Sequence, residues 1–195
     1  MINLSNAEVI GEGQERTCYQ HPLDALKVIK VPREGVRFRN QNGIDFIYYK
    51  YLKKSGKDLS LIPVCYGFEN TNIGIGLVTE KIVNDDNTPV VSMLDIIRNS
   101  MLELSEIDGM LSRLISYLKS NNIIFADVGL SNVLCRKKKS GGYDIFIVDG
   151  LGSRHLDFKF KVYMRIGLAA AYKVRKQINK LLSDYNRTVK KTYSA

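Results

Sequence analysis

The chain has 195 residues, 45% of them hydrophobic, and carries a formal net charge of +9 at pH 7. This length and composition suit one compact globular unit with a core of its own. No apolar run approaches the roughly 20 residues that a membrane-spanning helix needs. The N-terminus shows no basic start followed by an apolar block, so no signal peptide is expected and a cytoplasmic location is predicted.

The three cysteines, Cys18, Cys65 and Cys135, stand singly along the chain. An odd number without a Cys-x-x-Cys pair argues against a disulfide framework or a zinc site. Free thiols in a reducing cytoplasm are the expected state.

The positive charge is unevenly placed. Residues 1–152 hold 18 Lys and Arg against 18 Asp and Glu, whereas residues 153–195 hold 11 against 2. Such asymmetry indicates an acidic partner, which could be nucleic acid, a phosphorylated or lipid-linked substrate, or an anionic membrane surface. The alternative is a solvated basic face that only aids solubility.

The N-terminal part reads as antiparallel strands. Residues 7–31 predict a hairpin that turns at Gly11-Glu12-Gly13, followed by a third, apolar strand from 25 to 31. Two more short apolar runs, at 61–68 and 74–82, suit two further strands.

One helix interrupts these strands. Apolar residues recur at helical spacing from about 38 to 54, which predicts an amphipathic helix. The polar run at 84–89 is the expected boundary between two parts of the chain, residues 1–83 and residues 84–195.

After this boundary the pattern becomes mainly helical. Helix starts are expected at Ser92 and Ser105, because each is followed three residues later by an Asp, as in a capping box. Short strands are expected at 123–125 and 145–148. A last helical region is expected from about 158 to 185, with Lys and Arg on its outer face and frayed residues after it.

The most informative stretch runs from 125 to 152. Asp127 and Asn132 are five residues apart, and Asp149 ends the apolar run Ile-Phe-Ile-Val. A kinase-like site uses this order: the first Asp accepts or orients a hydroxyl proton, and the Asn and second Asp hold Mg²⁺. Turn-forming Asp and Asn residues are the alternative, but a carboxylate ending a buried strand needs a partner or a metal.

Upstream residues could complete a nucleotide site. Gly11 and Gly13 would let the backbone approach phosphates closely, although an ordinary hairpin turn would use the same residues. Arg16 stands where a third glycine would fall and could itself reach a phosphate. Lys30, flanked by apolar strand residues, is placed to bind phosphates, unless it is only an edge-strand lysine. Asp45 on the first helix is the possible carboxylate partner of Lys30.

Three segments together resemble a known family. They are the Gly-Glu-Gly to His-Pro segment at 11–22, Ile-Lys-Val at 29–31, and Phe-Ala-Asp-Val-Gly-Leu-Ser-Asn-Val-Leu at 125–134. The chain is similar over about 7–185 to the PhoP regulatory network protein YrbL family, a bacterial family placed in the protein-kinase-like superfamily. The resemblance implies an α+β, compact two-lobed protein-kinase-like fold with a minimal C-terminal lobe.

The same likeness assigns the remaining nucleotide contacts. Backbone groups of Glu80 and Ile82 would meet adenine at the hinge between the lobes, and Thr79 would stand behind that pocket. ATP and Mg²⁺ are the implied cofactors, and the implied lobes are residues 1–83 and 84–195.

The chain also departs from ordinary protein kinases. Phe125-Ala126 stands where His-Arg would precede the catalytic Asp, and Asp-Gly-Leu-Gly at 149–152 replaces Asp-Phe-Gly. Only 43 residues follow Gly152, too few for a long activation segment and a full set of C-lobe helices. The pattern is closer to compact small-molecule, lipid or sugar kinases.

Three functions stay open. The first is an ATP- and Mg²⁺-dependent phosphotransferase whose acceptor, an unknown protein, sugar or lipid hydroxyl, is acidic or surface-bound. The second is a pseudokinase-like nucleotide-binding regulator acting through its basic C-terminal region, for which the missing third glycine and Asp45 argue. The third is a module that binds nucleic acid or an anionic membrane surface. Nucleic acid is the less expected partner, since no aromatic ladder or recognised motif accompanies the charge.

Overall fold

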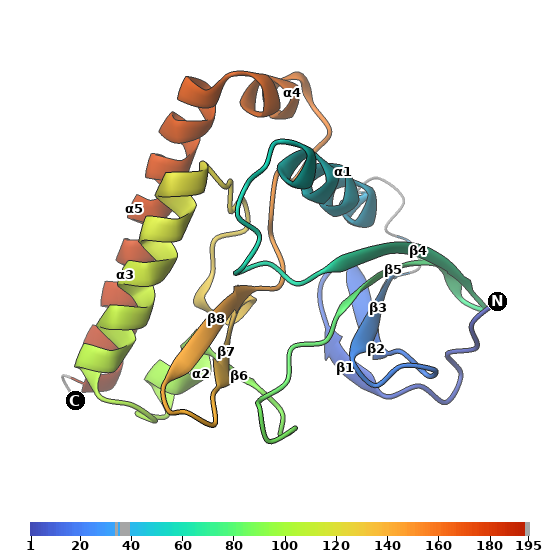
Figure 1. The fold of residues 1–195 in the computed structure, drawn as a ribbon, viewed down its shortest axis with the longest axis horizontal. Helices are drawn as coiled ribbons and strands as arrows, with labels where there is room; N and C mark the ends of the chain where they lie inside the picture. The colour runs from blue at the N-terminus through green and yellow to red at the C-terminus, as the bar shows by residue number, and fades with distance from the viewer. Residues whose placement is uncertain (34, 36–39, 194–195) are drawn as a thin grey trace.

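The computed structural model describes residues 1–33, 35 and 40–193, and it has mixed α+β structure, which confirms the predicted class (Figure 1). The N-terminal strands form one antiparallel sheet of five, in the order β1-β2-β3-β5-β4. Their bounds are β1 Val9–Glu12, β2 Arg16–Gln20, β3 Lys27–Pro32, β4 Cys65–Thr71 and β5 Gly74–Glu80. The predicted hairpin and third strand are confirmed, whereas the strand expected from 61 begins only at Cys65.

Helix α1, Gln41–Lys54, packs against strands β3, β4 and β5. The Asn40 side chain caps it by accepting a hydrogen bond from the Gly43 backbone N–H at 2.8 Å. This confirms the expected helix from Gln41 onward; positions 38 and 39 lie outside the described residues.

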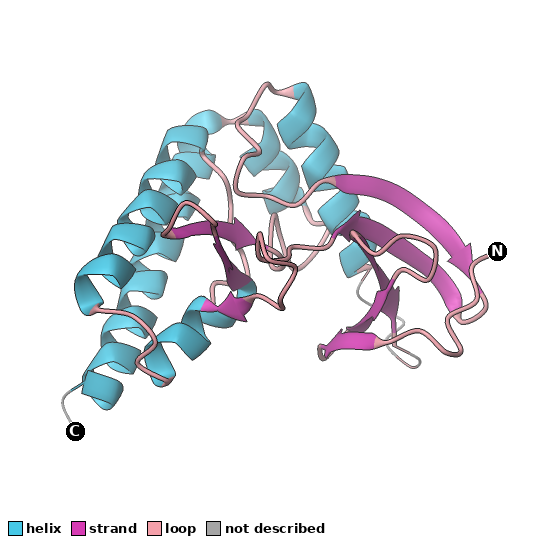
Figure 2. Cartoon of the chain, turned by 60° about the horizontal axis from the view of Figure 1, so that its bottom comes forward, coloured by secondary structure: helices cyan, strands magenta, loops and turns pink. Residues whose placement is uncertain are grey.

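The C-terminal part combines a small sheet with helices. Its elements are β6 Val91–Ser92, α2 Met93–Arg98, α3 Leu104–Asn121, the 3₁₀ turn η1 Leu130–Asn132, β7 Val133–Lys137, β8 Tyr143–Ile147, α4 Phe158–Arg165 and α5 Gly167–Tyr193. Strands β6, β7 and β8 form an antiparallel sheet in that order. Helices α3 and α5 lie side by side and form one wall of the molecule (Figures 1 and 2). No helix in the described part is long and apolar enough to cross a membrane.

The strand expected at 123–125 is wrong. The backbone N–H groups of this segment donate instead to the Leu118 carbonyl, the Tyr48 hydroxyl and the Gln177 side chain. These three contacts satisfy the donors that a strand neighbour would otherwise bind, so the segment forms only an isolated bridge, between Phe125 and Leu151. The strand that pairs with β8 is β7, on the other side of η1.

The helix ends differ in detail from the expectation. Ser92 and Asp95 do form a capping box at the start of α2. The start expected at Ser105 is wrong, because α3 begins at Leu104 with Glu103 and Glu106 forming the box. The frayed end is also wrong for the described residues, since α5 continues to Tyr193.

The first helix shares its core with the C-terminal part. Ile44, Tyr48 and Leu52 of α1 are buried in the large apolar cluster that includes residues of α2, α3 and α5. A second, smaller cluster inside the N-terminal sheet consists of Leu4, Ile29, Val31 and Val78. Helix α1 therefore fixes the sheet, through its packing, against the C-terminal helices.

Phe160 shows how α4 is held to this core. Its side chain is fully buried, and its ring centroid lies 5.7 Å from that of Tyr48. Phe158, two residues earlier on the same helix, is 79% exposed.

We predict that Phe160→Ala lowers the free energy of unfolding by about 3–5 kcal/mol, because it removes a fully buried ring and leaves a cavity. The matched control, Phe158→Ala, is expected to change it by less than about 0.5 kcal/mol. Urea denaturation followed by circular dichroism measures both. Equal effects of the two substitutions would contradict the packing of α4 described here.

Candidate active site

Two loops that carry predicted site residues are joined backbone to backbone. Phe125 and Leu151 form an antiparallel bridge. The Asp127 N–H donates to the Gly150 carbonyl at 3.0 Å, and the Gly152 N–H donates to the Ile124 carbonyl at 2.8 Å. This pairing brings the segment of Asp127 against the segment that follows Asp149.

Two glycines make this close approach possible. Gly150 and Gly152 both have φ of +79°, a left-handed conformation that residues with a side chain rarely adopt. A Cβ on Gly150 would lie 2.7 Å from the Asp127 Cβ, and one on Gly152 would lie 3.0 Å from the Tyr48 Cγ. The backbone therefore requires glycine at 150 and at 152.

Asn132 links both loops. Its side-chain Nδ2 donates to the backbone carbonyl of Asp127 at 2.9 Å, and its backbone carbonyl accepts from the Val148 N–H at 3.0 Å. Because Nδ2 is used in this way, the amide is oriented and the Oδ1 atom is left without a partner among the described residues. Asn132 thus offers one oxygen next to the strand end that carries Asp149.

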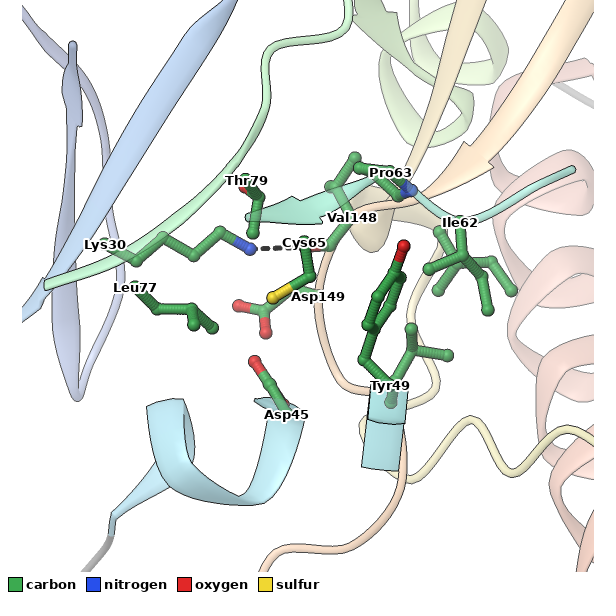
Figure 3. Close-up of a pocket in the computed structure, with 12 residues that line it drawn as sticks. Lys30, Asp45, Tyr49, Ile62, Pro63, Cys65, Leu77, Thr79, Val148 and Asp149 are labelled. Carbon is green, nitrogen blue, oxygen red and sulfur yellow. Dashed lines mark hydrogen bonds between the residues drawn. The ribbon is translucent and has the colours of Figure 1, made fainter. Parts of the chain in front are cut away.

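Lys30, Asp45 and Asp149 line one pocket between the N-terminal sheet, α1 and the end of β8. Figure 3 shows the Lys30 ammonium and the two carboxylates directed toward the same space, with Thr79 and Cys65 on its wall. The Lys30 Nζ donates to the Val148 carbonyl at 2.6 Å. The pocket volume of about 40 Å³ admits only water-sized groups, so a larger ligand would have to approach from outside it.

Arg16 binds both carboxylates of this pocket. Its guanidinium lies 2.7 Å from Asp45 Oδ2 and also forms an ion pair with Asp149. A third contact, 2.8 Å from Nη1 to Asn42 Oδ1, holds the group in place. Arg16 is only 7% exposed, so this is a buried charge cluster. The ion pair of Asp45 is therefore with Arg16, in place of the pair expected with Lys30.

These charges shift the pKa values of the cluster. Burial acts to raise the pKa of Asp149, but the charges of Lys30 and Arg16 outweigh it and hold that pKa below its ordinary value. For the more deeply placed Asp45, burial prevails over the same two charges and raises the pKa. For Arg16, burial is outweighed by Asp45 and Asp149, so its pKa is raised and it stays charged.

Asp127 lies on the open side of the paired loops. Its side chain is 54% exposed, and its Oδ1 is 2.5 Å from the Arg154 guanidinium, which is itself 59% exposed. An ion pair this open to solvent is weak and exchangeable. The Asp127 carboxylate is therefore accessible from solvent.

The remaining predicted residues surround the pocket without lining it. Gly13 closes the β1–β2 turn by donating to the Arg16 carbonyl at 2.9 Å, and Gly11 pairs with Cys18. The Glu80 N–H is already bound to the Val64 carbonyl at 2.8 Å. The Ile82 N–H has no hydrogen-bond partner among the described residues.

The donor set is compatible with Mg²⁺ only if phosphates complete it. No group of three His, Cys, Asp or Glu side chains suited to a metal occurs in the described part of the chain. Asn132 Oδ1 has no partner among the described residues. Asp149 has 43% of its side chain exposed, and both Arg16 and the Gly150 N–H bind its Oδ1 atom, which leaves Oδ2 open to a metal. Mg²⁺ is commonly held by one or two protein oxygens together with phosphate oxygens and water, so these residues fit it.

Several residues of the site were not expected from the sequence. Asn42, Arg154 and Tyr48 were missed because nothing in their local pattern distinguishes them from ordinary helix or tail residues. Arg16 did carry a signal, since it occupies the position of a third glycine, but its role as the partner of two acids depends on contacts 29 and 133 residues away in the chain.

Known proteins are similar to this chain over a range that includes the segments of this site. The family described as PhoP regulatory network protein YrbL matches residues 2–186. The chain is 29% identical over 163 residues to "Uncharacterized protein YrbL" of Escherichia coli (strain K12), covering 80% of this chain and 76% of that protein, and equally so to the protein of that name from Shigella flexneri. The family match includes the glycine turn, Lys30 and the paired loops. The chain therefore belongs to the PhoP regulatory network protein YrbL family.

Proposed function

We propose that this protein is an ATP- and Mg²⁺-dependent phosphotransferase with a compact, two-lobed, protein-kinase-like arrangement. One arrangement carries the proposal. The paired loops hold Asp127, Asn132 and Asp149 close together. Lys30 extends from the N-terminal sheet to the same place, where it donates to the Val148 carbonyl next to Asp149. Phosphoryl transfer depends on positioning and charge neutralisation, which such a group of residues supplies.

Each residue has a separate task in this proposal. Lys30 binds nucleotide phosphates, and Asn132 and Asp149 contribute oxygens to Mg²⁺, which when bound neutralises the phosphate charge. Asp127 orients the acceptor hydroxyl and takes its proton. The acceptor oxygen then bonds to the γ-phosphorus while the bond from that phosphorus to the β–γ bridging oxygen breaks, and ADP leaves with the electron pair.

The nucleotide would lie outside the small pocket, over the exposed side of Asp149. The Ile82 N–H, which has no partner among the described residues, is the donor we assign to adenine, whereas the Glu80 N–H is used within the protein. Thr79 lines the pocket together with Lys30, which agrees with a place behind the base. Because ATP and Mg²⁺ are abundant in the cytoplasm, the proposal places the protein there.

A second candidate function is a nucleotide-binding regulator without turnover. It is favoured by a specific observation, namely that both carboxylates of the proposed site are bound by arginines: Asp149 by Arg16 and Asp127 by Arg154. In this alternative the protein binds nucleotide but transfers no phosphate, and acts through its basic C-terminal region.

ATP turnover by the purified protein tests the first candidate. We expect Mg²⁺-dependent release of ADP that Asp149→Ala abolishes and that Asp127→Ala lowers by about 10²–10⁴-fold, because a positioned base is lost. Asp184→Ala removes a carboxylate from an ion pair on the surface of α5 and should leave turnover unchanged.

The outcomes separate the two candidates. Binding of ATP and Mg²⁺, seen as a raised melting temperature, without any turnover would favour the regulator over the phosphotransferase. Turnover that survives Asp149→Ala would contradict the assigned metal site.

Arg16 gives a second prediction. Arg16→Met leaves Asp45 buried without its counter-charge, so the free energy of unfolding should fall by about 3 kcal/mol. Arg187→Met, which breaks an exposed arginine–aspartate pair on α5, should cost less than about 1 kcal/mol. Chemical denaturation measures both. If the two variants are equally stable, the buried charge cluster does not exist as described.

A further inference from the structure

A cavity of about 430 Å³ lies next to Asp127 and is separate from the pocket of Lys30. Ala126 and Val128, the chain neighbours of Asp127, line it together with Arg154, whose guanidinium holds the Asp127 carboxylate. The loop after Gly152 and helices α4 and α5 form the rest of its wall. The volume is within the range of about 300–1,000 Å³ that is common for small-ligand sites.

The walls of this cavity are strongly cationic. Besides Arg154, four lysines line it: Lys159 of α4 and Lys173, Lys176 and Lys180 of α5. None of the four forms an ion pair with a carboxylate of the described residues.

The one acidic residue on the cavity wall offsets one of these charges, but it forms no ion pair with the lysines among the described residues. Asp157 accepts a hydrogen bond from the Phe160 backbone N–H at 2.8 Å and caps α4. The three lysines of α5 are three and four residues apart, so they lie along one face of that helix. The cavity therefore concentrates positive charge beside the residue proposed to orient the acceptor.

Gln177 adds an independent observation. It lines the cavity, is only 7% exposed, and its Oε1 accepts from the Phe125 N–H at 3.1 Å. That bond fixes the orientation of the amide, and the Nε2 donor is left buried with no partner among the described residues. A buried donor without an acceptor costs about 1–3 kcal/mol, so a ligand oxygen that reached Nε2 after a small shift of the side chains covering it would be stabilising.

We propose that this cavity binds a phosphate monoester group of the acceptor, which makes the acceptor a phosphorylated small molecule or headgroup that also carries a hydroxyl. The inference rests on the proposed function, because it assigns the acceptor to the Asp127 side of the paired loops. Several lysines and an amide donor suit a dianion with three terminal oxygens better than a single carboxylate. The cations line a hollow rather than a flat stripe, which favours a compact ligand over an extended polyanion.

Isothermal titration calorimetry of the full chain with inorganic phosphate, without nucleotide and at constant ionic strength, tests the site. Lys176→Gln combined with Lys180→Gln should weaken phosphate binding at least about tenfold, equivalent to about 1.4 kcal/mol. The matched control, Lys190→Gln combined with Lys191→Gln, changes the net charge equally at the far end of the same helix and should shift binding by less than about twofold.

A single-atom change tests the role of Gln177. Gln177→Glu keeps an oxygen that accepts from Phe125 but replaces the free donor by a second carboxylate oxygen, so phosphate binding should be lost. Its melting temperature, compared with that of the unchanged protein, verifies that the variant is folded. Phosphate binding that persists in folded Gln177→Glu would overturn the placement of the anion.

Two further probes distinguish the source of the phosphate. Glucose 6-phosphate represents a free sugar phosphate. Phosphatidylcholine vesicles containing phosphatidic acid represent a membrane-bound monoester, and vesicles with phosphatidylglycerol, a diester, are their control. Binding of either monoester that depends on Lys176 and Lys180 supports the proposal and names the source. Equal weakening by the two lysine pairs, or preference for the diester, would overturn it.

These measurements use no nucleotide, so they are independent of turnover. ATP turnover without phosphate binding in the cavity would sink this inference and leave the phosphotransferase intact. If the protein binds phosphate through these lysines but shows no ATP turnover, the phosphate site in the cavity is supported and its assignment to a kinase acceptor is not.

Discussion

The backbone pairing of 124–127 with 150–152 is the constraint on which the rest of the site depends. It sets Asp127 against Gly150 and holds the Asp149 loop to the segment before Asp127. The segment before Asp127 is in turn fixed from outside, since the Ile124 and Phe125 N–H groups donate to Tyr48 of α1 and Gln177 of α5. A site built in this way is positioned by helices that are far apart in sequence, and the two glycines at 150 and 152 allow the contact.

The buried cluster around Arg16 connects the N-terminal sheet to these loops. A charge taken out of water is stabilising only if it is well paired, and Arg16 has two carboxylates and the Asn42 amide. Lys30 is thereby freed from Asp45 and donates to the Val148 carbonyl. In the proposed function the same cluster would matter in two ways: it orients Asp149, and Arg16 would compete with a metal for one oxygen of that carboxylate.

Sequence patterns predicted the sheet, helix α1 and the order of the site residues, because alternation, helical spacing and the Asp-to-Asn interval are local features. They wrongly predicted a strand at 123–125. The groups that bind this segment instead, the Tyr48 hydroxyl and the Gln177 amide, lie 76 and 52 residues away in the chain. The Arg16 pairings and the cationic cavity were missed for the same reason. The surplus of positive charge after Gly152 was visible from composition; only the fold shows that part of it faces the Asp127 loop.

The central claim is that Lys30, Asn132 and Asp149 together form a site for metal-bound nucleotide phosphates. A crystal structure with a non-hydrolysable ATP analogue and Mg²⁺ tests it most directly. We predict phosphate oxygens within hydrogen-bonding distance of Lys30 and a Mg²⁺ ion bound by Asn132 and Asp149. A nucleotide bound elsewhere, or Asp149 bound by Arg16 with no metal beside it under saturating Mg²⁺ and analogue, would contradict the account.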